Sequence, residues 1–401
     1  MENGGDGSII AKAGIIAEIE QIDQRLAELR NDEKFHTVCD GGVARPIKPI
    51  QRLQSISAAD LVLENIPAME YLVNEILPKS GLVMVGAPPK SFKSWFCIDA
   101  GICVASGSDF LGFKTMQTAV LYLDLESTKR RPRERIIKIT SAAPNNFHII
   151  TAEQPVDKIG EGLEEQLADQ LAVHPDIGLI IIDVFKCVRP AQKRGVNDYD
   201  RDYADLGSLK KFADSNGVCI LVVHHTRKMK DPDDPFNELA GSTAVFGALD
   251  AALVISKKRR EDKEAVLHIT GRDMDSKALS VVFDEVTLRW RNIGDSEQVE
   301  RNRLVNEYSN SKIVNVVKRL LMQSNNEITY SVKELIEASQ YMGGGMLKIF
   351  DSVQKVGLDL VKYSELFETV DGIKAVKNCK DGKGCMTWTF YNILSDSPYS
   401  P

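Results

Sequence analysis

The 401-residue chain lacks long hydrophobic runs, a basic start and an excess of positive charge. No stretch of about 18 apolar residues occurs, and the opening residues M-E-N-G-G-D are not a basic segment followed by an apolar one. We therefore expect a cytoplasmic protein without a membrane partner. With 50 Lys and Arg against 57 Asp and Glu, the net charge of −7 excludes a uniformly basic nucleic-acid coat, so any such contact has to be local.

Cysteines, repeats and low-complexity tracts are also scarce. The seven cysteines form an odd, scattered set, and most lie inside apolar runs, which indicates reduced core thiols rather than a disulfide framework. Cys379 and Cys385 have no second cysteine pair or nearby histidine to complete a zinc site. The composition, 43% hydrophobic and 27% charged, is that of a globular chain long enough for two or three domains.

The first 64 residues predict an N-terminal amphipathic helix and a linker. Apolar residues recur at three- and four-residue spacing within residues 1–35: Ile15, Ile16, Ile19, Ile22, Leu26 and Leu29. Two prolines within 43–49 then predict an extended segment. We expect the main globular domain at 65–300 and a further domain at 301–401.

Between residues 65 and 300, short apolar runs alternate with amphipathic stretches. The runs predict strands at 81–86, 119–126, 147–150, 179–184 and 219–225. The stretches predict helices near 93–106, 128–140, 157–173 and 200–215. This alternation predicts an α/β fold with a mostly parallel central sheet covered on both faces.

Three more strand-like runs follow without helices between them, at 251–256, 265–270 and 279–283. They predict a partly antiparallel extension at one edge of the sheet. The basic run at 257–260 joins two of these strands and is interpreted as a solvated hairpin.

The C-terminal region, 301–401, predicts three short helices near 311–322, 331–339 and 346–356, followed by two strands. This order is similar to a winged helix-turn-helix domain. Lys348 and Lys355 on the third helix are candidate contacts to duplex DNA, and docking of another protein is the alternative.

The strongest local motif follows the strand at 81–86 and leads into the helix at 93–106. It comprises Gly86, Ala87, Pro88, Pro89, Lys90, Ser91, Phe92, Lys93, Ser94 and Trp95. A strand, a tight loop, Lys-Ser and a helix form a phosphate-binding loop, because the loop amides and the helix N-terminus face phosphate oxygens. Lys93 is expected to reach the terminal phosphates of a nucleotide, and Ser94 to bind Mg²⁺.

Two residues of this loop depart from the usual pattern G-x-x-x-x-G-K-[ST]. Counted back from Lys93, Ala87 and Phe92 stand where the motif has glycine, and Gly86 is one residue early. Phe92 places a side chain where glycine normally permits close approach to phosphate. A polar strand–helix turn without a ligand therefore remains the alternative at this point.

Acidic residues end the next predicted strands. Asp124 and Glu126 close the strand at 119–126, which we expect to adjoin the phosphate loop, and either could activate a water, with Glu126 the first candidate. The alternative is an acid that caps the following helix. Asp183 closes the run L-I-I-I-D, the Walker B pattern for holding Mg²⁺, although aspartate also commonly ends a strand at a turn.

His224 and His225 end the strand at 219–225, at the edge where ligands bind open α/β sheets. One of them could donate a hydrogen bond to a terminal phosphate and report its loss to the following loop. The alternative is one buried and one surface histidine without a role at a site.

Six stretches in order carry a family resemblance: P-P-K-S-F-K-S-W-F, V-L-Y-L-D-L-E, I-I-I-D-V, L-V-V-H-H-T-R-K, A-G-S-T-A-V-F-G-A-L-D and H-I-T-G-R-D. They make residues 65–293 similar to the RecA-like P-loop ATPases of the plasmid replicative helicase RepA type, a phage- and plasmid-associated group of AAA family ATPases. Members commonly carry P-P-K-S-G-K-S, so Phe92 is a local departure that bears on nucleotide binding.

The resemblance implies ATP and Mg²⁺ as cofactors. It places Lys93 on the phosphates, Ser94 and Asp183 at Mg²⁺, and Glu126 as the catalytic base. It also favours His225 over His224 as the sensor. Arg272 matches the arginine finger that reaches a neighbouring subunit's ATP in a hexameric ring, and a surface pair with Asp273 is the alternative.

Single-stranded DNA is the expected partner of such a ring. The segment 229–240 corresponds to a loop that faces the central channel, where Arg227, Lys228 and Lys230 could contact a DNA backbone and Phe236 could stack on a base. A solvated loop is the alternative. Three functions stay open: a DNA helicase or translocase in replication of a mobile element, a KaiC-like or recombinase-like switch without unwinding, and a catalytically silent DNA-binding or assembly module.

Overall fold

The structure is a computed structural model, and two compact units divide it, residues 1–68 and 69–401. It describes residues 37–40, 43–46, 55–66, 68–191, 197–227, 231, 234–239, 243–259, 261–324, 326–341, 352–380 and 386–393. In the first unit, β1 (Thr37–Asp40) pairs antiparallel with β2 (Val43–Pro46), and α2 (Ala58–Leu63) begins after Ser57, whose side chain accepts the N–H of Asp60. The helix predicted within 1–35 lies outside the described residues.

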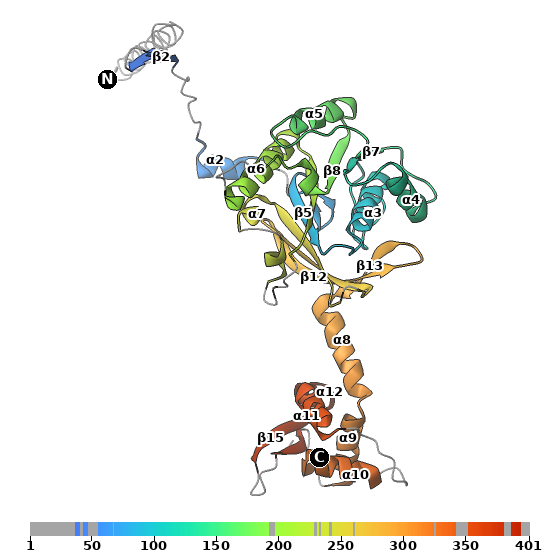
Figure 1. Cartoon of the computed structure of the whole chain (residues 1–401). Helices are drawn as coiled ribbons and strands as arrows, with labels where there is room; N and C mark the ends of the chain where they lie inside the picture. The colour runs from blue at the N-terminus through green and yellow to red at the C-terminus, as the bar shows by residue number, and fades with distance from the viewer. Residues whose placement is uncertain are drawn as a thin grey trace, which may run out of the picture. The chain divides into compact units, whose positions relative to one another are not determined.

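A nine-stranded sheet forms the core of the second unit (Figure 1). Its strands are β5 (Gly81–Ala87), β6 (Ala119–Asp124), β7 (Phe147–Thr151), β8 (Ile177–Asp183), β9 (Cys219–His225), β10 (Ala251–Ser256), β11 (Glu264–Gly271), β12 (Met274–Asp284) and β13 (Arg289–Asp295). They lie in the order β13-β12-β11-β10-β5-β9-β8-β6-β7. The six strands from β10 to β7 run parallel and the others antiparallel, which confirms the predicted mostly parallel sheet with an antiparallel edge.

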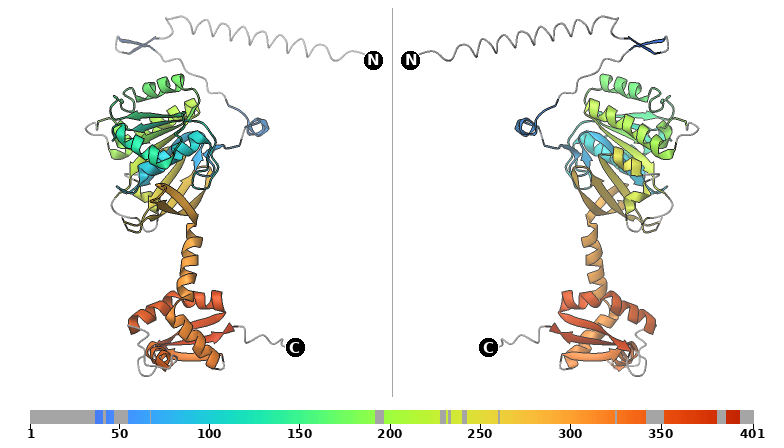
Figure 2. Two further views of the ribbon diagram at one scale, coloured as in Figure 1. Left: turned by 90° about the vertical axis from the view of Figure 1, so that its right-hand side faces the viewer. Right: turned by 90° about the vertical axis from the view of Figure 1, so that its left-hand side faces the viewer.

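Helices cover both faces of this sheet (Figure 2). They are α3 (Lys93–Ser106), α4 (Arg130–Ile139), α5 (Leu163–Val173), α6 (Asp198–Asn216) and α7 (Thr243–Ala248), with 3₁₀ turns η2 (Phe185–Val188) and η3 (Pro235–Glu238). In β5, Val83 and Val85 pack in the core that holds α3, whereas Leu82 and Met84 pack in the core that holds α5 and α6. A strand buried on both faces needs apolar residues throughout, which is why the apolar run at 81–86 predicted this strand. A small sheet of β3 (Tyr71–Val73) and β4 (Leu77–Pro78) precedes β5.

The strand order separates β6 from β5, the strand before the loop. β9 and β8 lie between these two strands. Because β5, β9, β8 and β6 are all parallel, their carboxyl ends still meet at one edge of the sheet. This edge gathers the polar residues that close each strand.

The C-terminal region forms a core of its own. It contains α8 (Ser296–Ser309), α9 (Lys312–Gln323), β14 (Glu327–Ser331), α10 (Val332–Tyr341), α11 (Val353–Lys362), α12 (Ser364–Asp371), β15 (Ile373–Lys380) and β16 (Met386–Asn392). The strands form an antiparallel sheet in the order β14-β16-β15 around a core that includes Tyr308, Phe367 and Phe390. Three helices and two strands were predicted, so α8, α12 and β14 were missed, and α8 runs across the boundary expected at residue 300. Of the helix expected at 346–356, residues 353–356 begin α11 and 346–351 lie outside the described residues.

Candidate active site

The loop between β5 and α3 is the centre of the site. β5 ends at Ala87 and α3 begins at Lys93. Lys90 and Phe92 both adopt left-handed backbone conformations, with φ of 64° and 65°. Among the described residues, no hydrogen bond is donated by the N–H groups of Lys90, Ser91, Phe92, Lys93 or Ser94. A row of free amides at a helix N-terminus is suited to bind an anion such as phosphate.

A cavity of about 440 Å³ opens beside this loop. Its lining residues are Lys90, Ser91, Phe92, Lys93, Ser94, Trp95, Asp124, Glu126, Ser127, Arg131, Arg135, Asp183, Val184 and His225. The cavity thus brings together the second half of the predicted loop, Glu126, Asp183 and His225. Gly86, Ala87, Pro88 and Pro89 do not line it, and a Cβ at Gly86 would lie 2.0 Å from a methyl carbon of Leu239, so this glycine makes room for packing.

Lys93 and His225 are in direct contact. The buried Lys93 Nζ donates to the carbonyls of Ala87 at 3.1 Å and Pro88 at 3.3 Å, and it lies 2.8 Å from His225 Nδ1. Because an ammonium group only donates, His225 Nδ1 accepts and the imidazole is neutral. Burial, and then the Lys93 charge, lower the pKa of His225, and burial lowers the pKa of Lys93 against the opposing charges of Asp183 and Glu126. His224 instead faces Phe185, edge to face.

Two carboxylates close neighbouring strands at the same level. Asp124 of β6 pairs in register with Asp183 of β8, and Tyr122 donates its hydroxyl to Asp183 Oδ2 at 2.8 Å. Asp124 is buried, its Oδ2 has no hydrogen-bond partner among the described residues, and burial raises its pKa. A buried, unpartnered carboxylate oxygen in a cavity is a place for a water or a ligand-bound water.

Glu126 is exposed at the same cavity. It was weighed as a capping acid for the next helix, but α4 begins only at Arg130, has Lys129 at its N-cap position and has no acid in its first turn. Glu126 is therefore free to face the cavity, where water reaches it.

Two basic residues of the cavity, Arg131 and Arg135, were missed. Arg131 donates to Ser127 Oγ at 3.3 Å, and the guanidinium carbon of Arg135 lies 5.7 Å from the centre of the Trp95 ring. Both belong to the run K-R-R-P-R-E-R after Glu126. Their four-residue spacing, which puts both side chains on one face of α4, was the signal that could have identified them.

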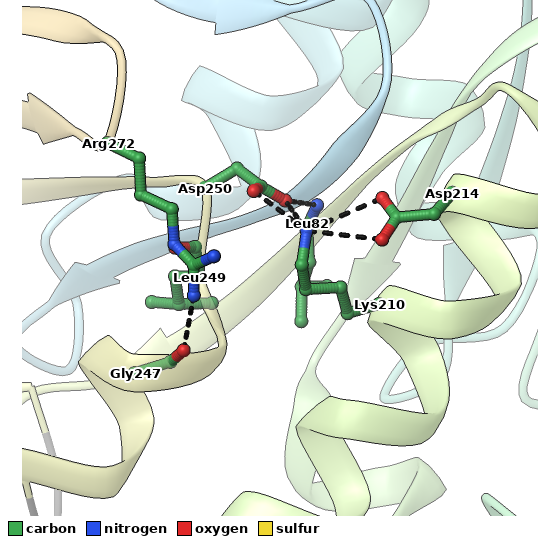
Figure 3. A network of polar contacts seen from close by, with 7 residues as sticks. All are labelled: Leu82, Lys210, Asp214, Gly247, Leu249, Asp250 and Arg272. Carbon is green, nitrogen blue, oxygen red and sulfur yellow. Dashed lines mark hydrogen bonds and ion pairs between the residues drawn. The ribbon is translucent and has the colours of Figure 1, made fainter. Parts of the chain in front are cut away.

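Arg272 does not line this cavity. Its Nε donates to the carbonyl of Leu249 at 3.1 Å and its terminal nitrogen to that of Gly247, and it forms no ion pair with Asp273 in the described part of the chain. The neighbouring Asp250 binds Lys210 at 2.7 Å and the N–H of Leu82 at 2.8 Å. Figure 3 shows the guanidinium of Arg272 on the other side of Asp250 from Lys210.

Strand register places Arg272 at the sheet edge opposite to the loop. Gly271 pairs with Ala251 at the amino end of β10, and Ala251 pairs with Val83 near the amino end of β5. Lys93 follows the carboxyl end of β5 at Ala87, four residues beyond Val83 and so roughly 13 Å away at the usual rise per strand residue. Arg272 is thus directed away from the cavity of its own chain and does not line it.

The candidate DNA contacts are only partly described. Phe236 lies edge to face against Phe246 and His268, with ring centres 5.7 and 6.3 Å apart, so it packs on the core rather than standing open for a base. Lys228, Lys230 and Lys348 lie outside the described residues. Lys355 is exposed on α11. No described helix is both long and apolar enough to cross a membrane.

Comparisons with known proteins agree with a phosphate-loop domain. Residues 47–231, just under half of the chain, match a family model described as an AAA domain, and this range holds the loop, Glu126, Asp183 and His225. No curated protein sequence matches the chain. This match, the mostly parallel sheet and the loop geometry together support a P-loop domain of the ATPase type.

Several solved structures are similar in fold, and three of them are each 14% identical to this chain. One is an ATPase domain, for which the match covers 54% of this chain and 85% of the other, with a TM-score of 0.44. A DnaB-like replicative helicase, solved with its interactions with primase, gives coverages of 71% and 76% with a TM-score of 0.47. The RadB recombinase gives coverages of 54% and 92% with a TM-score of 0.37.

Proposed function

We propose that the chain binds Mg²⁺ and ATP in this cavity and hydrolyses the terminal phosphate, as the motor of a RecA-like ring that acts on DNA in replication of a phage, plasmid or similar element. The observation that carries the proposal is the convergence of Lys93, His225, Asp183 and Glu126 on a loop whose amides have no partner among the described residues. A polar turn without a ligand does not require these four side chains at one cavity.

Each residue has a defined task in this proposal. Bound Mg²⁺, which Ser94 and Asp183 would hold, supplies positive charge that stabilises the phosphate oxygens. Glu126 accepts the proton of the attacking water. Lys93 exchanges its bonds to Ala87, Pro88 and His225 for the phosphate, which frees the His225 imidazole to sense the same group.

The position of Arg272 supports assembly of several copies. A loop at one sheet edge and an arginine at the opposite edge suit a head-to-tail contact, in which each copy completes the site of the next. Repeated around a closed ring, such as a hexamer, this contact makes hydrolysis depend on assembly. Arg272 would then leave the carbonyls of Gly247 and Leu249.

DNA is the proposed partner of the ring. Single-stranded DNA would pass the segment after Arg227, and a winged-helix reading of the C-terminal region would place α11 with Lys355 on duplex DNA. The order α9-β14-α10-α11-β15-β16 and the three-stranded sheet support this reading.

ATP hydrolysis with and without single-stranded DNA tests the proposal. Wild type should turn over ATP with Mg²⁺ and faster with DNA, and Lys93→Ala should lose turnover by at least about 100-fold. Lys138→Ala is the matched control, because Lys138 is exposed on α4 and does not line the cavity. Equal rates in Lys93→Ala and wild type would refute the proposal, and DNA-stimulated turnover without strand displacement would indicate the switch instead of a helicase.

A further inference from the structure

Phe92 occupies the position that most distinguishes this loop. It lies at the N-cap of α3 with φ 65° and ψ 27°, a left-handed conformation that glycine adopts freely and other residues rarely do. In an isolated loop, a phenylalanine would tend to leave this conformation. Something in the fold therefore has to hold it there.

A stack of aromatic side chains provides this support. The Phe92 ring lies parallel to Phe283 of β12, with ring centres 4.1 Å apart and an angle of 9°. Phe283 contacts Trp290 of β13 edge to face at 5.5 Å, and the Trp290 indole N–H donates a long hydrogen bond of 3.5 Å to the Phe92 carbonyl. Both the side chain and the backbone of residue 92 are thus fixed to the β12–β13 hairpin.

A cation completes the cluster. Lys257 Nζ lies 4.9 Å from the Phe92 ring and 5.7 Å from the Trp290 ring, and Lys257 is only 5% exposed. It belongs to the basic run 257–260, which was interpreted as a solvated hairpin, so that interpretation was wrong at this residue. A buried ammonium against aromatic faces adds attraction to the stack.

We infer that Phe92 is a positioning residue of the phosphate loop: stacking on Phe283 replaces glycine's conformational freedom and keeps residue 92 in the left-handed conformation that leaves its amide open to phosphate. This inference rests on the proposed ATP site. It contrasts with the view from the sequence that the Phe92 side chain obstructs the nucleotide. Glycine obtains this loop shape without support, whereas phenylalanine requires the hairpin.

The test is a double-mutant cycle of ATP affinity by calorimetry, with wild type, Phe283→Leu, Phe92→Gly and the double variant. Phe283→Leu should weaken ATP binding by roughly 5- to 30-fold, because binding must then restore the left-handed conformation of an unsupported phenylalanine. Phe92→Gly removes the need for the stack, so in that background Phe283→Leu should change ATP affinity by less than about 3-fold.

Rescue by glycine separates this role from general damage to the core. If Phe283→Leu weakens binding equally with and without the Phe92→Gly substitution, or leaves the affinity of wild type unchanged, Phe92 is not positioned by the stack. If only the variants with Phe92→Gly bind ATP, the side chain is an obstruction and the inference is overturned.

Failure of the proposed function gives a different result. If none of the four proteins binds ATP, the cavity is not an ATP site. The same four proteins are then compared by urea unfolding, which needs no nucleotide. Non-additive effects of the two substitutions on the free energy of unfolding would still show that Phe283 holds residue 92 in place. Additive effects would overturn the inference.

Discussion

Tyr122 shows how a single residue prepares the site for a metal ion. Its hydroxyl donates to Asp183 Oδ2 from the adjacent strand, and both side chains are buried. Tyr122→Phe removes only this donor, so Asp183 keeps its place in the strand but loses its fixed orientation. We expect the Mg²⁺ concentration for half-maximal ATP turnover to rise several-fold, and stability to fall by roughly 1–3 kcal/mol. A Mg²⁺ titration and urea unfolding measure the two effects.

Tyr308→Phe is the matched control. Tyr308 also donates a buried phenol hydroxyl to a carboxylate, that of Asp371, but within the C-terminal core. The two variants should lose similar stability, whereas only Tyr122→Phe should change the Mg²⁺ requirement. An unchanged Mg²⁺ requirement in Tyr122→Phe would show that Asp183 is oriented without it.

His224 makes stability depend on pH. Burial, followed by the charges of Arg189, His225 and Lys93, lowers the pKa of His224 from 6.5 to about 4. Between these values the unfolded chain binds a proton that the folded chain does not, so stability falls as the pH drops below 6.5. His224 should lower the free energy of unfolding by about 2 kcal/mol between pH 8 and pH 5.

The comparison of wild type with His224→Asn isolates this contribution. The free energy of unfolding, measured with urea at pH 8 and at pH 5, should fall by about 2 kcal/mol less in the variant than in wild type. Other groups, including Asp99 with the opposite sign, are common to both proteins and cancel. Equal losses in the two proteins would contradict a depressed pKa for His224.

Single residues at the end of each strand could be predicted, and their partners could not. Glu126, Asp183 and His225 each follow an apolar run, so parallel pairing alone brings them to one edge. The contacts of Tyr122 with Asp183 and of Phe92 with Phe283 depend on strand order and on a hairpin remote in sequence. Neither leaves a periodic signal in the chain.

At the scale of elements, β13 anchors the helix that carries the loop. Arg289 Nε donates to the buried Asp99 of α3 at 2.7 Å, and a terminal nitrogen of Arg289 lies 2.9 Å from Cys103 Sγ. Burial raises the pKa of Asp99 to about 6 even though Arg289 opposes this. The adjacent Trp290 reaches Phe92, so one strand holds α3 at two turns.

Arg289→Met should therefore be strongly destabilising. It leaves Asp99 buried without its counter-charge and should cost about 3 kcal/mol at pH 8 by urea unfolding. The cost in free energy of unfolding should be smaller at pH 5. The pKa of Asp99 rises further in the variant, so its carboxyl is protonated in the folded state at pH 5 and no charge is left without a partner. Arg291→Met on the same strand is the control: Arg291 is 65% exposed and pairs with Asp284 at 3.4 Å, so its loss should cost less than about 1 kcal/mol. Equal losses for both variants would show that the Asp99 pair does not anchor α3.

The strands and helices around the loop were predictable because burial on two faces gives continuous apolar runs. β13 was not, because its sequence R-W-R-N-I-G-D is mostly polar and its strand identity comes from pairing with β12. α8 was missed for a related reason: its apolar residues are few, and only Tyr308 in it is buried. Tertiary contacts, rather than local pattern, determine both elements.

At the scale of the whole molecule, the proposed function requires more than one copy of the chain. Each copy carries Lys93 after the carboxyl end of β5 and Arg272 at the opposite edge. Lys93→Ala and Arg272→Ala should each abolish turnover, the first through loss of phosphate contact and the second through loss of the neighbour's arginine. Arg272→Ala should still bind ATP, since its own cavity is intact.

Mixing the two inactive proteins should restore part of the activity. A complete site forms where an Arg272→Ala copy supplies the loop and a Lys93→Ala copy supplies the arginine. In an equal mixture, about a quarter of the head-to-tail contacts have this composition. Steady-state hydrolysis of the mixture should therefore approach about a quarter of the wild-type rate after subunit exchange. If Arg272 only caps α7, its variant should lose thermal stability and the mixture should remain inactive. Recovery of turnover, by contrast, requires the loop of one copy and the arginine of another to meet at a shared site.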